Sequence, residues 1–100
     1  MLTFNLRDFE LLSETGRAKL SPQEARLLLC LIAEKEVSWE KLSKDLKKNL
    51  ANIRVLLFRL RRVLAHLGER NLIWTERGKG LFLSQPIKLE INGILDSKIS

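Results

Sequence analysis

The order of hydrophobic patterns along this chain predicts an α+β fold, in which a small N-terminal antiparallel sheet precedes three helices and a C-terminal β-hairpin. Three observations lead to this prediction. The first twenty residues alternate apolar and polar side chains, residues 21–67 place leucines at helical spacing, and residues 71–83 alternate again around a turn rich in glycine. At 100 residues the chain is the size of one domain.

The N-terminal segment predicts three short strands joined by turns. Residues 2–6, 9–12 and 17–20 have the strand pattern, and residues 13–16 read Ser-Glu-Thr-Gly, a sequence that favours a turn. A sheet of this size is stable only when other elements cover one face. We therefore expect it to pack on the helices that follow.

Capping residues mark the start of the first two helices. Ser21, Pro22 and Glu24 form the pattern of an N-cap, a first-turn proline and a capping box, so a helix is expected from there to about Glu34. Ser38 is expected to cap a second helix over about residues 39–46. A third helix is expected over about residues 50–67, with Gly68 as its C-terminal stop.

The third helix divides into an apolar face and a cationic face. Stepping by 100° per residue puts Ile53, Leu57, Leu60, Leu64 and Leu67 on one stripe, with Leu56 and Val63 beside it. The opposite face collects Val55, Phe58, Arg59, Arg62 and His66, with Asn52 at its edge and with Arg54 and Arg61 on its flanks. No acidic residue lies between positions 49 and 67. Arginine is well suited to phosphates and guanine edges, so this face predicts contact with nucleic acid.

Three residues of that face allow two interpretations each. Asn52 either reads an adenine or caps the start of the helix. Val55 and Phe58 either contact thymine methyl groups or are covered by another part of the protein.

The hairpin adds cations beside this helix. Residues 71–76 and 81–83 have strand character, and the turn between them reads Arg77-Gly78-Lys79-Gly80. A cationic hairpin tip can reach phosphates or a minor groove. A hairpin after a helix–short link–helix unit defines a winged helix-turn-helix, which is the fold we predict.

Charge is distributed unevenly in the same way. Residues 38–85 contain eleven Lys and Arg against four Asp and Glu, whereas residues 1–37 contain five against six. A segregated positive field indicates a polyanionic partner. A merely solvated surface, or a helix lying on an anionic membrane, are the alternatives, but the leucine face is needed for the core and little apolar surface is left for lipid.

Other classes of function find little support. Cys30 is the only cysteine and His66 the only histidine, and neither has partners at a catalytic or metal-binding spacing, so we expect no enzyme activity, no metal and no cofactor. We expect Cys30 to be a buried, inert thiol. The longest apolar run has seven residues and no signal peptide is visible, so we expect a cytoplasmic protein without a membrane span.

Four motifs, in the same order, resemble the OmpR/PhoB-type winged-helix domain of bacterial transcription regulators. They are Leu20-Ser21-Pro22-Gln23-Glu24 before paired leucines, Val37-Ser38-Trp39-Glu40-Lys41-Leu42, Arg59-Leu60-Arg61-Arg62-Val63-Leu64, and Ile73-Trp74-Thr75-Glu76-Arg77-Gly78-Lys79-Gly80. The resemblance covers about residues 2–84. It implies a response-regulator-like protein that binds double-stranded DNA, with the third helix in the major groove and contacts from Arg59, Arg61, Thr75 and Arg77.

The pattern also departs from that family. Leu81 replaces the aromatic residue that follows the second wing glycine, and Leu56 and Phe58 stand where polar residues are common, so no base preference can be transferred. The link between the second and third helices, which contacts RNA polymerase in some members, is short here. RNA polymerase and a second copy on paired half-sites are still expected partners. A winged helix that binds protein or RNA without specific DNA binding is the alternative.

Residues 85–100 are expected to form an extension. Residues 87–91 alternate and predict either an extra strand or a linker to a further domain, as in the N-terminal domains of SARP-type activators. Because Met1 almost coincides with the first strand, we expect no receiver domain before it, and either a small complete regulator or the N-terminal part of a larger one.

The DNA contacts predicted from all of this are nine: Asn52, Val55, Arg59, Arg61, Arg62, His66, Thr75, Arg77 and Lys79.

Overall fold

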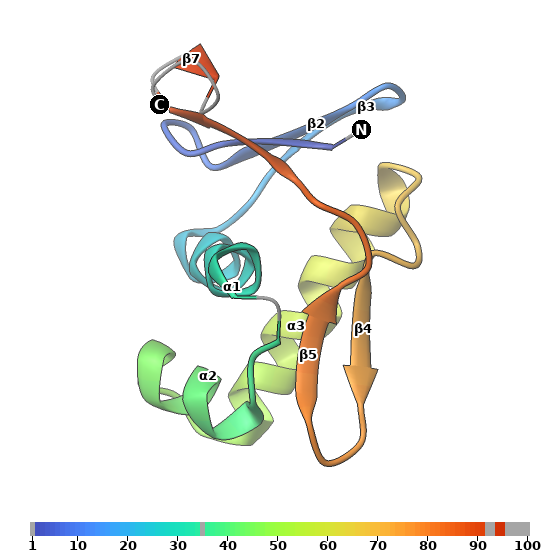
Figure 1. Cartoon of the computed structure of the whole chain (residues 1–100). Coiled ribbons are helices and arrows are strands. Elements are labelled where there is room, and N and C mark those ends of the chain that lie inside the picture. The colour runs from blue at the N-terminus through green and yellow to red at the C-terminus, as the bar shows by residue number, and fades with distance from the viewer. Residues whose placement is uncertain (1, 35, 92–93, 96–100) are drawn as a thin grey trace.

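The computed structural model describes residues 2–34, 36–91 and 94–95. Its elements follow the predicted order, with three helices and seven strands in these residues. The sheet lies across one end of the molecule, α1 lies beneath it, and the hairpin β4–β5 extends beside α3 away from the sheet (Figure 1). The bounds are β1 Thr3–Asn5, β2 Glu10–Ser13, β3 Gly16–Lys19, α1 Pro22–Ala33, α2 Trp39–Leu46, α3 Leu50–His66, β4 Ile73–Glu76, β5 Gly80–Leu83, β6 Lys88–Ile91 and β7 Ile94–Leu95.

The sheet is larger and more mixed than the three antiparallel strands that we expected. Its order is β3-β2-β1-β6-β7, so the C-terminal strand β6 lies next to β1 and runs parallel to it, with Phe4 opposite Leu89. The β1–β2 and β2–β3 pairs are antiparallel as predicted. The second strand starts one residue later than expected because Phe9 has a positive φ of 52°, which is turn geometry. Residues 88–91, which were expected to form a strand or a linker, are therefore a strand of this sheet.

Helix α1 begins with the predicted capping box. The backbone N–H of Glu24 donates to the Ser21 hydroxyl at 3.2 Å, and the backbone N–H of Ser21 donates to Oε1 of Glu24 at 2.8 Å. Two backbone N–H groups that would otherwise lack a partner are thus satisfied. Pro22 has no backbone N–H, so its position leaves no donor without a partner. The helix ends at Ala33, because Glu34 is already extended.

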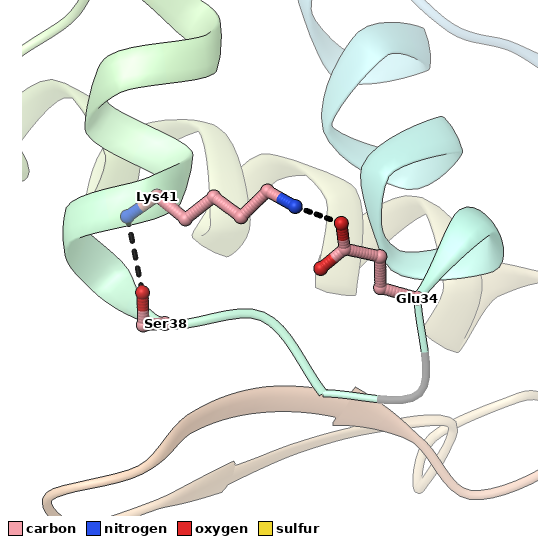
Figure 2. A network of polar contacts seen from close by, with 3 residues as sticks. All are labelled: Glu34, Ser38 and Lys41. Atoms are coloured by element: carbon pink, nitrogen blue, oxygen red, sulfur yellow. Dashed lines mark hydrogen bonds and ion pairs between the residues drawn. The ribbon is translucent and has the colours of Figure 1, made fainter.

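Side chains before and after the α1–α2 turn make polar contacts with one another. The Ser38 hydroxyl accepts from the backbone N–H of Lys41 at 3.1 Å, which confirms Ser38 as the N-cap of α2. Lys41 also pairs with the carboxylate of Glu34, so one residue links the end of α1 to the first turn of α2 (Figure 2). The pair is exposed, and such pairs contribute at most about 1 kcal/mol.

Helix α3 has the predicted length within one residue. Its N-cap is Asn49, whose Oδ1 accepts from the backbone N–H of Asn52 at 2.9 Å, so the interpretation of Asn52 as the cap was wrong. At the other end, Glu69 N–H donates to the carbonyl of Leu64 at 2.8 Å and Gly68 N–H donates to that of Ala65 at 3.0 Å. This pattern is a Schellman motif and confirms Gly68 as the stop.

One hydrophobic core joins all of these elements. On α3 the buried residues are the predicted Ile53, Leu56, Leu57, Leu60 and Leu64. The core contains Phe4 and Leu11 from the sheet and Leu81 from the hairpin, all fully buried. Fully burying one such side chain stabilises the fold by roughly 1.5–3 kcal/mol, so the leucine face of α3 is fixed inward and its opposite face outward.

The hairpin is attached to the helices through its backbone. Beyond the four pairs of β4 and β5, Val37 and Leu81 form a bridge in which each N–H donates to the other's carbonyl at 2.8 Å. Gly80 lies against the same segment with φ +130°, and a Cβ there would lie 2.1 Å from the Val37 carbonyl oxygen. Only glycine permits this approach.

We expect Gly80→Ala to lower the free energy of unfolding by about 3 kcal/mol or more, because the methyl group would collide with backbone that cannot move without breaking the bridge. The matched control is Gly78→Ala. Gly78 has φ +81° but nothing within 4 Å of an added Cβ, so only about 1 kcal/mol of backbone strain is expected. Urea unfolding of the three proteins measures both values, and equal losses at the two positions would contradict the steric argument.

Candidate nucleic-acid interface

The nine predicted contact residues are all exposed, and they lie on α3 and on the hairpin. Asn52, Val55, Arg59, Arg61, Arg62 and His66 belong to α3, Thr75 lies on β4, and Arg77 and Lys79 lie in the turn before β5. Their exposure follows from the leucine face of α3, which turns the remaining side chains of the helix toward solvent.

Arg61 joins the helix to the hairpin. Its Nη2 donates to the carbonyl of Ile73, the first residue of β4, at 3.3 Å. Arg61 also lines a hollow of about 330 Å³ together with Arg70, Asn71, Ile73, Trp74 and Thr75. Two predicted contact residues, one from each element, therefore line a single concave surface.

Arg70 is a cation of this surface that our sequence analysis missed. Besides the hollow shared with Arg61, it lines a second one of about 200 Å³ with Arg62, Ala65 and His66. Arg70 lies in the turn after Gly68, beyond the end of α3, so the helical periodicity that identified the other arginines did not include it. The clue in the sequence was its position, between the end of a cationic helix and the start of a cationic hairpin.

The surface is electropositive because its arginines have no acidic partners. No ion pair of the described residues includes Arg59, Arg61, Arg62, Arg70 or Arg77. Lys79 differs, since its ammonium lies 3.5 Å from a carboxylate oxygen of Glu76. Unpaired guanidinium groups, in two elements that share a hollow, leave a field that attracts polyanions.

Apolar side chains stand among these cations. Val55 is 48% exposed and Phe58 is 62% exposed, so the suggestion that another element covers them was wrong. The Arg62 guanidinium lies over the Phe58 ring at 5.9 Å from its centroid. Arg54 lies over Trp39 of α2 at 5.7 Å. Trp74 on β4 is also exposed, and its indole N–H donates to the Asn71 carbonyl at 2.7 Å.

The described residues do not gather the side chains that bind metal ions. No group of three or more potential metal ligands occurs in that part of the chain. Within it, no helix is both long and apolar enough to cross a membrane. Cys30 is half-buried rather than buried as expected.

The fold and this surface define a class, the winged-helix domains. One similar solved structure is the C-terminal domain of the nisin resistance regulator NsrR, a lantibiotic response regulator, with 30% sequence identity and a TM-score of 0.71. The match covers 82% of this chain and 89% of that one. Neither a family model nor a curated protein sequence matches the chain. The chain belongs to the OmpR/PhoB-type winged-helix DNA-binding domains of response regulators, as its motifs indicated.

We expect the Cys30 thiol to react slowly in the folded protein. Burial, and after it the negative charge of Asp45, raise the pKa of this thiol above its ordinary value, while Arg26 and Lys41 oppose the shift. Less thiolate is therefore present at neutral pH, and thiolate is the reactive species. Reaction with a chromogenic disulfide reagent at pH 7.5 should be slower in buffer than in urea, where burial and the Asp45 charge no longer act on the thiol. Equal rates in the two solvents would contradict it.

Proposed function

We propose that this chain binds double-stranded DNA sequence-specifically as the DNA-binding domain of a bacterial transcription regulator. In this proposal α3 lies in the major groove, and the hairpin serves as a wing on the minor groove or the adjacent backbone. The observation that carries the proposal is the set of unpaired, exposed arginines on two elements that share one hollow. The family to which the chain belongs supports it independently. Such a protein would act in the cytoplasm.

The residues divide into two roles. Arg59 and Asn52, on the exposed face of α3, are proposed to read base edges, since arginine pairs with guanine and asparagine with adenine. Arg61, Arg62, His66, Arg70, Thr75, Arg77 and Lys79 are proposed to contact the sugar–phosphate backbone, which sets affinity and position but carries little sequence information.

The second candidate function is a winged helix that docks on another protein or on RNA. The exposed rings of Phe58 and Trp74 favour it, because aromatic residues are frequent anchors of protein interfaces. The cations weigh against a protein partner, since the cores of protein interfaces are poor in unpaired charge. Binding to duplex DNA that weakens steeply with salt is expected for the proposed function and not for the second candidate.

We expect Arg59→Ala and Arg77→Ala to weaken DNA binding in different ways. A duplex site would first be selected from a random pool with the unmodified protein. Loss of Arg59 should remove roughly 1–3 kcal/mol of discrimination between the selected site and a site mismatched at one base pair. Loss of Arg77 should lower affinity for both duplexes by the same factor and reduce the slope of log K against log salt by about 0.9. Gel-shift titrations at several salt concentrations give all of these quantities.

Arg7→Ala is the matched control, because Arg7 is exposed at the turn after β1 and its substitution changes net charge equally. This variant should retain both the affinity and the salt slope. Identical behaviour of the Arg59 and Arg77 variants on every duplex would refute the division of roles. Failure of the unmodified protein to bind any duplex at low salt would refute the function.

We further propose that two copies bind paired half-sites, because one helix reads only a short stretch of DNA. Native mass spectrometry of the selected duplex should find two chains per duplex, and halving the site should leave one. A single chain on the full selected duplex at saturation would contradict paired binding.

RNA polymerase is proposed as a further partner. The link between α2 and α3 has only residues 47–49, and Lys48 N–H donates to the Ser43 carbonyl at 3.1 Å, so a contact made by this link would be small.

A further inference from the structure

The outermost ridge of α3 is apolar where a DNA-reading helix needs groups that distinguish bases. Ala51, Val55, Phe58 and Arg62 follow one another at spacings of four, three and four residues, which places them on one line of the helix. That line is directly opposite the buried face formed by Ile53, Leu57, Leu60 and Leu64. All four ridge residues are exposed, and three of them carry no hydrogen-bonding group.

The arginines of α3 surround this ridge. Helical geometry puts Arg54 and Arg61 on one side of it and Arg59 on the other. The fourth arginine, Arg62, continues the ridge and lies over the Phe58 ring. Despite that contact the ring remains 62% exposed. The result is a narrow apolar strip with guanidinium groups on both sides.

The charge around the strip indicates what covers it. A protein partner wide enough to bury Phe58 would also cover the arginines on both flanks, which have no acidic partners of their own. A lipid surface would need a wider apolar face than this strip, because the leucine face of α3 is buried in the core. A DNA major groove satisfies both features, because its walls are lined with phosphates and its floor presents the C5-methyl groups of thymines. The groove is also wide enough to admit a helix.

Resting on the proposed function, we infer that the ridge of Val55 and Phe58 recognises thymine methyl groups, so that the half-site contains A·T pairs at the centre of the helix contact. Phe58 supplies most of the apolar area and is the specificity-determining residue. Arg62 holds the ring from one side, while Arg59 and Asn52 remain for hydrogen bonds at the edge of the same face. Discrimination at these central positions therefore depends on methyl groups.

Replacing thymine by deoxyuridine tests this inference, because the change removes only the methyl group and retains the base-pairing edge. Each thymine of the selected duplex is replaced singly and affinity is measured at constant salt. At one or two central positions we expect affinity to fall about fourfold, the factor that corresponds to one buried CH₂ at about 0.8 kcal/mol. Replacement at the remaining positions should change affinity less than twofold.

Protein variants assign the effect to the ridge. In Phe58→Ala the sensitive thymines should become insensitive, so that the thymine and deoxyuridine duplexes bind alike. Leu50→Ala is the matched control, since Leu50 is an exposed leucine of the same helix that lies off the ridge. It should preserve the fourfold difference. Because Phe58 is exposed, its replacement should leave the fold intact, and a circular dichroism spectrum checks this.

The outcomes separate the two proposals. Tight, salt-dependent duplex binding that no deoxyuridine substitution weakens would overturn the thymine inference and leave the DNA-binding function standing. Fourfold sensitivity that persists in Phe58→Ala and Val55→Ala would also overturn it, because another element would then be the reader. No duplex binding by the unmodified protein at low salt would refute the function and the inference together.

Discussion

Two backbone hydrogen bonds between Val37 and Leu81 determine where the wing lies relative to α3. They attach the hairpin to the α1–α2 turn, and α2 in turn packs on α3. Because the bonds join main-chain atoms, they add to the attachment that the buried Leu81 side chain provides. Gly80 is the requirement that makes this approach possible. The Arg61 contact with the Ile73 carbonyl adds a second connection, directly from α3. The helix and the wing therefore present their cations as one surface.

The segment that follows the wing connects it to the N-terminal sheet. Beyond β5 the chain runs up to the sheet, where β6 lies beside β1 (Figure 1). Ser84 N–H donates to the Leu72 carbonyl at the base of the hairpin, and Lys88 N–H donates to the Leu2 carbonyl at the start of the sheet. Backbone hydrogen bonds therefore hold the chain at the base of the wing and again where it joins the sheet.

Local signals predicted the helices well, and nonlocal pairing was less accessible. Ser21, Ser38 and Gly68 set helix ends through hydrogen bonds to residues nearby in sequence, and the sequence alone located each of them. Asn52 was misread because Asn49, three residues earlier, has an equally good capping side chain. The parallel pairing of β6 with β1 joins residues more than eighty positions apart, and alternation can indicate a strand but cannot identify its neighbour. Similarly, the place of Arg70 beside Arg61 and Arg62 depends on how the turn packs against α3, which the sequence pattern does not show.

The composition of the exposed face has a consequence for how sequence specificity can arise. Arginines that contact phosphates strengthen binding to every duplex equally, so adding them raises affinity without raising discrimination. In the proposed complex only Arg59 and Asn52 offer directional hydrogen bonds, while the ridge offers apolar contacts, each of which separates bases by a small factor. One such helix cannot distinguish its site from the many competing sites of a genome. Discrimination multiplies when two copies must bind correctly spaced half-sites, because the differences in free energy add. A ridge of this kind therefore favours cooperative recognition of short, A·T-containing repeats over tight binding of one long site.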